Sequence, residues 1–251
     1  MRGKRIDADL PLVLYDANEP NMPHDATLVN PLERYHDNHP LKEGRAYKLL
    51  GIYLDEHLSL NFHTDHIVSK LTKSLYCIRQ AKNIITPLGL RALYFALIHS
   101  HLVYCSSIMS ILSAKNVNKI KKVQKKAIRI IDNSAYNAHT NPIFLEHQIL
   151  PYELILKQSQ LLFMHSIYHN YAPSSFANIW TTNAERAPQL NLRNATDYCL
   201  PQPRTEAFKK SPFYALPQAW NDLSPFIKYQ NNRTTFKWAL KAHLLDELTD
   251  I

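Results

Sequence analysis

Apolar residues recur with a helical period along most of the chain after residue 60. The first such stretch has four apolar residues at spacings of four, four and three: Ile67, Leu71, Leu75 and Ile78. This spacing places them on one face of a helix. Asn61 or Thr64 is expected to supply the N-cap of this helix, because both side chains can accept a hydrogen bond from a free backbone amide. Thr86 and Pro87 then mark the start of a second helix, since proline suits the first helical position.

The same period predicts further helices at about 87–109, 114–132, 151–170 and 234–248. Residues 206–220 are expected to form a helix and a turn. Residues 171–205 have few periodic apolar residues and several prolines, which indicates an extended connection.

The pattern before residue 60 is different. Residues 46–54 are rich in aromatic and branched side chains and predict a strand, which residues 55–57 follow as a turn. A shorter apolar run at 6–15 predicts another strand, with Pro11 placing it at an edge or a strand start. Residues 16–46 are mostly loop. We therefore expect a mainly α fold, a helical bundle with a small N-terminal antiparallel β element.

Three parts are predicted along the chain. Residues 1–60 form the small β element and loops, residues 61–135 a basic helical domain, and residues 136–251 a C-terminal helical region with the proline-containing connection near 171–205.

Positive charge is concentrated in one part of the chain. The 29 Lys and Arg outnumber the 21 Asp and Glu, for a net charge of +8. Residues 61–135 alone have 12 basic and 2 acidic side chains, so the whole excess lies there. Such a local basic patch is typical of a surface that binds a polyanion, most often nucleic acid. An anionic membrane surface is the rival partner.

The predicted helix at 114–132 has seven cationic residues and no acidic one between positions 115 and 129: Lys115, Lys119, Lys121, Lys122, Lys125, Lys126 and Arg129. We call this set the basic stripe. All except Lys121 and Lys125 follow spacings of 4, 3, 4 and 3, and apolar residues occupy the opposite face. Solvated helix faces usually mix charge signs, because like charges at i,i+4 repel. Phosphate contact is therefore favoured over a solvated face, and five contacts predict a slope of log K against log[salt] of roughly −3.5 to −4.5.

The sequence offers little support for catalysis. It has no Gly-x-Ser-x-Gly, no His-Glu-x-x-His and no phosphate-binding glycine loop. Asp7 and Asp9 would share a strand face and could hold Mg²⁺, but a solvated edge strand is the favoured interpretation.

Two pairs of side chains have the spacing of metal ligands on a helix. His63 and His66 are three residues apart, and His101 and Cys105 are four apart. A structural zinc site usually needs four ligands in two close pairs, so ordinary packing is favoured and no metal site is assigned. The odd count of three cysteines favours a reducing compartment, and no secretory signal or membrane span is expected.

Several segments resemble, in the same order, the reverse transcriptases of non-LTR retrotransposons of the jockey/CR1 type. Residues 47–55 are similar to their Tyr-Lys-x-Leu-Gly-(Val/Ile)-x-(Ile/Leu)-Asp strand, and residues 93–105 match Leu-Tyr-x-Ala-x₂-His-Ser-His-x₂-Tyr-Cys. Residues 122–129 are similar to the family's Leu-Gln-Lys-x-Ala-Ile-Arg segment. Shorter likenesses lie at 66–73, 138–150, 192–201 and 217–223. Each segment is weak alone, but seven in order over residues 47–223 make a specific signal.

The resemblance implies a thumb and a remnant of the polymerase palm, which together hold a template–primer duplex of RNA or DNA. Lys48, Leu50 and Gly51 would lie at the primer grip, where a residue without Cβ lets the backbone come close. Fingers and most of the palm would precede Met1, and the location would be the cytoplasm, the nucleus or both. No membrane partner is expected.

The family is an RNA-directed DNA polymerase that uses palm carboxylates to hold two Mg²⁺ ions. Its Asp-Asp hairpin does not occur in this chain. No catalytic residue and no cofactor is therefore assigned, and the chain is expected to be inactive alone. Two alternatives stay open at this point: a domesticated, non-catalytic nucleic-acid-binding module, and a non-functional remnant of a retroelement.

Overall fold

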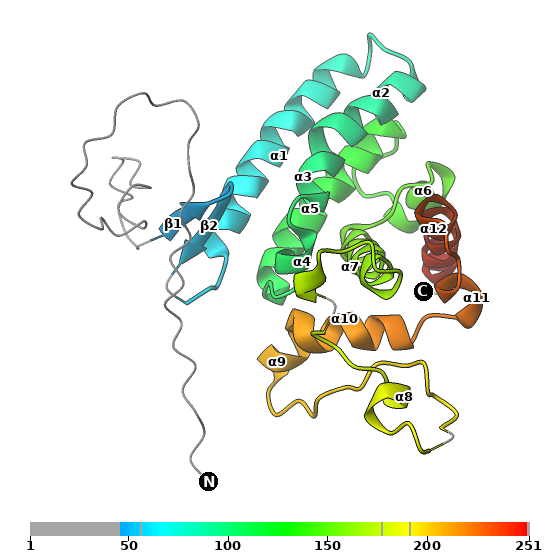
Figure 1. The fold of residues 1–251 in the computed structure, drawn as a ribbon. Coiled ribbons are helices and arrows are strands. Elements are labelled where there is room, and N and C mark those ends of the chain that lie inside the picture. Colours follow the sequence, from blue (N-terminus) through cyan, green and yellow to red (C-terminus); the bar gives the residue numbers. More distant parts are fainter. Residues whose placement is uncertain (1–45, 56, 177, 191, 250–251) are drawn as a thin grey trace, which may run out of the picture. The chain divides into compact units, whose positions relative to one another are not determined.

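The structure, a computed structural model, describes residues 46–249 apart from 56, 177 and 191 (Figure 1). The strand predicted at 6–15, with Asp7 and Asp9, lies outside the described residues. The described part is mainly helical, with one two-stranded antiparallel sheet at its start. The predicted fold class is confirmed at this level.

The strand predicted at 46–54 is a hairpin instead. β1 (Ala46–Leu49) pairs antiparallel with β2 (Ile52–Asp55). The register pairs Ala46 with Asp55, Tyr47 with Leu54, Lys48 with Tyr53 and Leu49 with Ile52. Leu50 and Gly51 form the turn with positive φ angles of 47° and 83°. A two-residue turn with both φ angles positive matches the twist of the flanking strands. The prediction of one strand was wrong because the residue types alone gave no sign that Leu50 is left-handed.

α1 (Asn61–Ala81) follows the hairpin and buries all four residues of its predicted face. Its start differs from the prediction. Leu60 precedes the helix in a left-handed conformation, and no side chain caps the first turn. Asn61 and Thr64 both lie inside the helix, and the Thr64 hydroxyl donates back to the Leu60 carbonyl at 2.8 Å.

The helix predicted at 87–109 is a series of shorter segments: α2 (Pro87–Tyr94), a π-helical stretch (Phe95–His99), α3 (Ser100–Val103) and α4 (Ser106–Met109). Its start is as predicted, because the Thr86 hydroxyl accepts from the Gly89 amide at 3.2 Å. The chain then turns at Tyr104, which is extended, and at Cys105, which is left-handed. His101 and Cys105 therefore do not share one helix face as expected.

α5 (Ala114–Ile131) confirms the helix predicted at 114–132. The Ser113 side chain caps it by accepting from the Asn116 amide at 3.4 Å. Its inner face is apolar as predicted, but it also buries two polar side chains, Asn116 and Gln124.

The remaining elements are α6 (Thr140–Glu146), α7 (Tyr152–Tyr168), a short 3₁₀ turn (Ser174–Phe176), α8 (Asn183–Arg186), α9 (Glu206–Lys210), α10 (Pro212–Asn221), α11 (Pro225–Lys228) and α12 (Arg233–Thr249). The connection at 171–205 is largely irregular, as predicted. It is held by a backbone bridge between Thr182 and Tyr198, and by α8, which has a capping box formed by Thr182 and Glu185.

The core is one continuous cluster of buried apolar side chains that reaches from Ile52 to Leu248. α7 lies at its centre and contacts α3, α4, α5, α10 and α12. Trp220 and Phe236 are among its largest fully buried side chains, and their rings lie 6.0 Å apart. The predicted boundary at residue 135 falls between α5 and α6, and the division of the chain into three parts stays a prediction.

His99, at the end of the π-helical stretch, is largely buried. Its ring meets the Phe95 ring edge-on at 5.0 Å, and its Nδ1 atom has no hydrogen-bond partner among the described residues. Burial, and then the nearby Lys237 and Lys241, lower the pKa of His99 from 6.5 to about 4. As the pH falls below 6.5, the unfolded chain therefore takes up a proton that the folded chain takes up only near pH 4.

This shift predicts an acid-dependent loss of stability. Above about pH 6.5, His99 is neutral in both the folded and the unfolded chain and does not lower the free energy of unfolding. Between pH 6.5 and 4, it lowers the free energy of unfolding progressively, by up to about 3 kcal/mol. The variant His99→Phe should lose less free energy of unfolding over this range than the unchanged chain, as measured by urea unfolding at pH 7, 5.5 and 4.5. Equal losses in the two proteins would contradict this assignment.

Candidate nucleic-acid interface

The basic stripe lies on a helix that runs parallel to α1. The side-chain amide of Asn116 donates to the side-chain oxygen of Asn61 at 2.8 Å, and Lys119 forms an ion pair with Asp65. The two partners are 55 residues apart in the first contact and 54 in the second. Because this separation stays nearly constant along the two helices, α1 and α5 run in the same direction. The exposed side of α1 therefore continues alongside the stripe toward the α1–α2 turn.

Three residues of the basic stripe are free to contact a ligand. Lys115, Lys122 and Lys126 are exposed and form no ion pair within the described residues. They lie on the side of α5 opposite its buried residues, as the spacing predicted. Lys125, which is half-buried, also forms no ion pair in this part of the chain.

The other three residues are engaged within the fold. Lys119 pairs with Asp65, and Lys121 pairs with Glu153 at 2.8 Å. Arg129 donates from Nε to the Ala138 carbonyl at 2.9 Å, which leaves its two terminal nitrogens available. Pairs at an exposed surface contribute little free energy, so a phosphate could replace the carboxylate beside Lys119.

A buried hydrogen-bond network fixes the rotation of α5. The Gln124 side chain donates to the Tyr94 hydroxyl at 2.8 Å and to the Leu150 carbonyl at 3.0 Å. It also accepts from the Tyr152 backbone amide at 2.8 Å. Burial raises the pKa of Tyr94 far above its usual value, so the phenol stays neutral and can accept. The sequence did not predict the role of Gln124, because a glutamine within a lysine-rich stretch resembles the residues of the polar face.

The hairpin residues predicted at the primer grip lie near α1 and the end of α3. They do not belong to the helix that carries the basic stripe. Lys48 Nζ is 5.9 Å from the centroid of the Tyr53 ring, and the Tyr104 hydroxyl donates to the Leu50 carbonyl. A Cβ added at Gly51 would meet Tyr104 at 3.6 Å, an ordinary contact. The turn, with its φ of 83°, therefore accounts for this glycine without any close approach. Contact with a primer stays a prediction.

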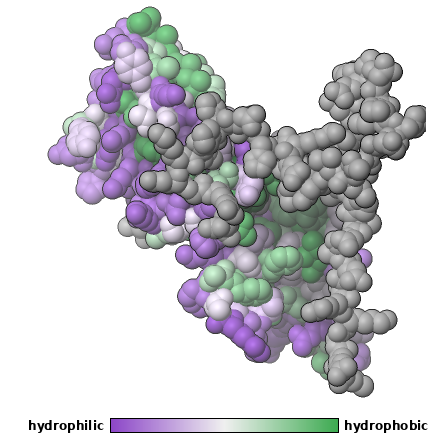
Figure 2. All heavy atoms as spheres, turned by 90° about the vertical axis from the view of Figure 1, so that its left-hand side faces the viewer, coloured by the Kyte–Doolittle hydropathy of each residue, from purple (hydrophilic) through white to green (hydrophobic). Residues whose placement is uncertain are grey.

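The surface on this side is mixed. Figure 2 shows patches of hydrophilic and of hydrophobic atoms on the face that carries the hairpin in Figure 1, with hydrophobic atoms also at the top, where the α1–α2 turn lies. Two of the most exposed apolar side chains, Ile84 and Leu88, lie in that turn and at the start of α2. Two others, Leu49 and Leu50, belong to the hairpin.

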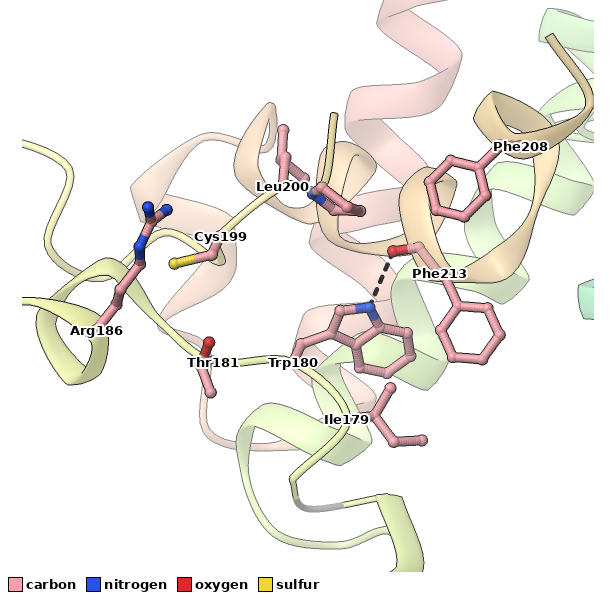
Figure 3. Close-up of a pocket in the computed structure, with 9 residues that line it drawn as sticks. Ile179, Trp180, Thr181, Arg186, Cys199, Leu200, Phe208 and Phe213 are labelled. Atoms are coloured by element: carbon pink, nitrogen blue, oxygen red, sulfur yellow. Dashed lines mark hydrogen bonds between the residues drawn. The ribbon is translucent and has the colours of Figure 1, made fainter. Parts of the chain in front are cut away.

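A pocket of about 490 Å³ lies in the segment predicted as an extended connection and in the helices that follow it (Figure 3). Trp180 and Phe213 form one side of it, and the indole N–H of Trp180 donates to the Phe213 carbonyl at 3.1 Å. Arg186 and Cys199 lie toward the other end. Its lining is spread over residues 179–213 without a period, so no sequence signal pointed to it.

The described part of the chain has neither a cluster of metal ligands nor a helix that could cross a membrane. No group of three or more His, Cys, Asp or Glu side chains there is arranged to hold a metal ion. None of the described helices combines the length and the apolar character needed to cross a membrane.

No family model, no curated protein and no solved structure matches this chain. The likeness of residues 47–223 to reverse transcriptases therefore rests on the sequence segments alone and is carried forward as a proposal.

Proposed function

We propose that the chain is the C-terminal part of a non-LTR retrotransposon reverse transcriptase and that it binds the backbone of a template–primer duplex. The observation that supports this most is the basic stripe. Three exposed lysines without ion-pair partners among the described residues lie on one side of a helix whose rotation is fixed by buried hydrogen bonds. A rigid row of cations suits a regularly spaced row of phosphates.

The length of the stripe agrees with this proposal. Lys115 and Arg129 are fourteen residues apart, which is about 21 Å along the helix axis. One strand of a duplex presents a phosphate about every 3.4 Å along its axis, so the stripe spans about six of them. Such contacts hold and orient a duplex without reading its sequence.

In this proposal the helices correspond to the thumb and the hairpin to the last part of the palm. The catalytic carboxylates would belong to upstream domains of the same polyprotein, together with their Mg²⁺ ions. The role of this chain is therefore binding, and a primer-extension assay on the chain alone should show no synthesis above background.

The salt dependence of binding tests the proposal. We expect the purified chain to bind a fluorescein-labelled 20-base-pair duplex, measured by fluorescence anisotropy in 50–300 mM salt. Three free lysines predict a slope of log K against log[salt] of about −2.7, and recruitment of Lys119 and Arg129 would steepen it to about −4.5. A slope near zero, or no binding at 50 mM salt, would exclude the proposal. A DNA duplex and an RNA–DNA hybrid should be compared.

A further inference from the structure

A second group of basic side chains surrounds Tyr53, away from the basic stripe. It comprises Lys48 of β1, His63, His66, Lys70 and Lys73 of α1, and His101 of α3, and we call it the histidine cluster. The Tyr53 ring lies 4.9 Å from the His66 ring and 6.5 Å from the His63 ring. Lys48 lies over the same ring. The hairpin and α1, which are neighbours in sequence, and the more distant α3 therefore bring these groups together.

His63 holds an unsatisfied donor within this cluster. Its side chain is only 2% exposed, and its Nδ1 atom accepts from the Tyr53 backbone amide at 3.5 Å. The proton of the neutral ring must then be on Nε2, which is buried and has no partner among the described residues. A buried N–H without an acceptor is costly, and an anion or water would relieve that cost.

The charges in the cluster act on one another, and no described carboxylate pairs with them. Burial, then Lys70, Lys48, His101 and Lys73, lower the pKa of His66. Burial and then Lys70 lower the pKa of His101. Burial, then His66 and Lys70, lower the pKa of His63.

No acidic side chain of the described residues pairs with these groups. The nearby Asp55 carboxylate is occupied by the Ser59 hydroxyl and by the backbone amides of His57 and Ser59. Within residues 46–249, apart from the three that are not described, the cluster therefore has no anionic partner.

We propose that the histidine cluster binds a phosphate group of the nucleic-acid backbone and that the cluster takes up protons when it does so. This inference rests on the proposed function and adds a second contact surface to it. A phosphate beside His66 and His101 would favour their protonated forms, in which both ring nitrogens donate and the ring is charged. His63, whose Nδ1 accepts from the Tyr53 amide, would donate to the phosphate from Nε2 as a neutral ring. Affinity should consequently rise as the pH falls through the range in which histidines titrate.

Nucleic acid is favoured over a membrane because α1, which carries most of the cluster, also contacts the stripe on α5. Asp65 of α1 pairs with Lys119 of the stripe, and the next residue, His66, belongs to the cluster. Both surfaces consist of side chains that are cationic or can become so by protonation, which suits rows of phosphates. A duplex that lies along α5 could therefore bring a second row of phosphates toward the cluster.

The first test measures the pH dependence of binding at constant ionic strength. The labelled duplex is titrated with the full chain between pH 8.0 and 5.5, and circular dichroism checks that the chain stays folded. If one histidine takes up a proton on binding and its pKa rises by about one unit, the affinity for the duplex rises by at most about tenfold. We expect roughly that gain for the unchanged chain and less than about twofold for His66→Gln/His101→Gln. His243→Gln on α12 serves as the matched control and should retain the full gain.

The second test counts the protons directly. Calorimetric titration with the duplex at pH 6.5, in two buffers of different ionisation enthalpy, should show uptake of up to about half a proton, the most that one group can take up when its pKa rises by about one unit, and clearly less in His66→Gln/His101→Gln. Lys70→Gln should weaken binding at every pH, whereas Lys237→Gln should not.

The outcomes separate the two proposals. Duplex binding without proton uptake, or equal uptake in His66→Gln/His101→Gln and His243→Gln, would overturn the role of the cluster and leave the stripe standing. Absence of duplex binding at every pH would overturn the proposed function itself. Proton-linked binding only to phosphatidylserine vesicles would replace nucleic acid by a membrane as the ligand and would overturn both.

Discussion

Replacement of Lys115, Lys122 and Lys126 together by glutamine is expected to weaken duplex binding by roughly 100- to 1,000-fold at 0.1 M salt. Each lost phosphate contact removes about 0.9 from the salt exponent, which corresponds to roughly an eightfold loss at this salt concentration. The slope of log K against log[salt] should become shallower, with its magnitude reduced by about 2.7. Anisotropy titrations of the variant and the unchanged chain over the same salt series measure both quantities.

Loss of positive charge alone must be distinguished from loss of these contacts. The matched control replaces Lys210, Lys237 and Lys241 by glutamine, which removes the same charge from α9 and α12. We expect this control to bind within about threefold of the unchanged chain, because unpaired charges more than a Debye length from the duplex are largely screened. Equal weakening in the two triple variants would mean that net charge, and not the stripe, drives binding.

Replacement of Gln124 by leucine is expected to have the largest effect on stability. Leucine has a similar size but can form none of the three hydrogen bonds that Gln124 makes. The Tyr152 amide and the Tyr94 hydroxyl would then be buried without partners, and each such group costs about 1–3 kcal/mol. We expect the free energy of unfolding to fall by about 3–5 kcal/mol, as measured by urea unfolding.

The control for this variant is Gln80→Leu on α1, where the glutamine is exposed. Its effect should stay within about 0.5 kcal/mol. A loss below 1 kcal/mol for Gln124→Leu would show that the network contributes little and that apolar packing alone fixes α5. The variant therefore tests whether the network holds the helix that carries the stripe.

Local signals in the sequence predicted the helices well. The face of α1, the length of α5 and the start of α2 at Thr86 and Pro87 all follow from spacing and capping within a few residues of each position. The candidate stripe was found in the same way, because every member lies on one helix. Such features depend on neighbours along the chain, which the sequence displays directly.

Features that depend on distant partners could not be predicted. The carboxylate that pairs with Lys119 is 54 residues away, and the three groups that bond to Gln124 come from α2 and from the start of α7. The histidine cluster likewise needs the hairpin, α1 and α3 together. His63 and His66 were noted as a pair, but their surroundings come from the tertiary fold.

The π-helical stretch constrains how this protein can vary. Tyr94, Ile98 and Leu102 are all buried at intervals of four residues. In an unbroken α-helix, two such intervals would turn the last of them about 80° away from the first. The wider turn at Phe95–His99 keeps all three in the core and also sets the direction of His101. A π-helical turn corresponds to one residue inserted into an α-helix. Loss of a single residue from this stretch would therefore rotate α3 and take His101 away from the cluster.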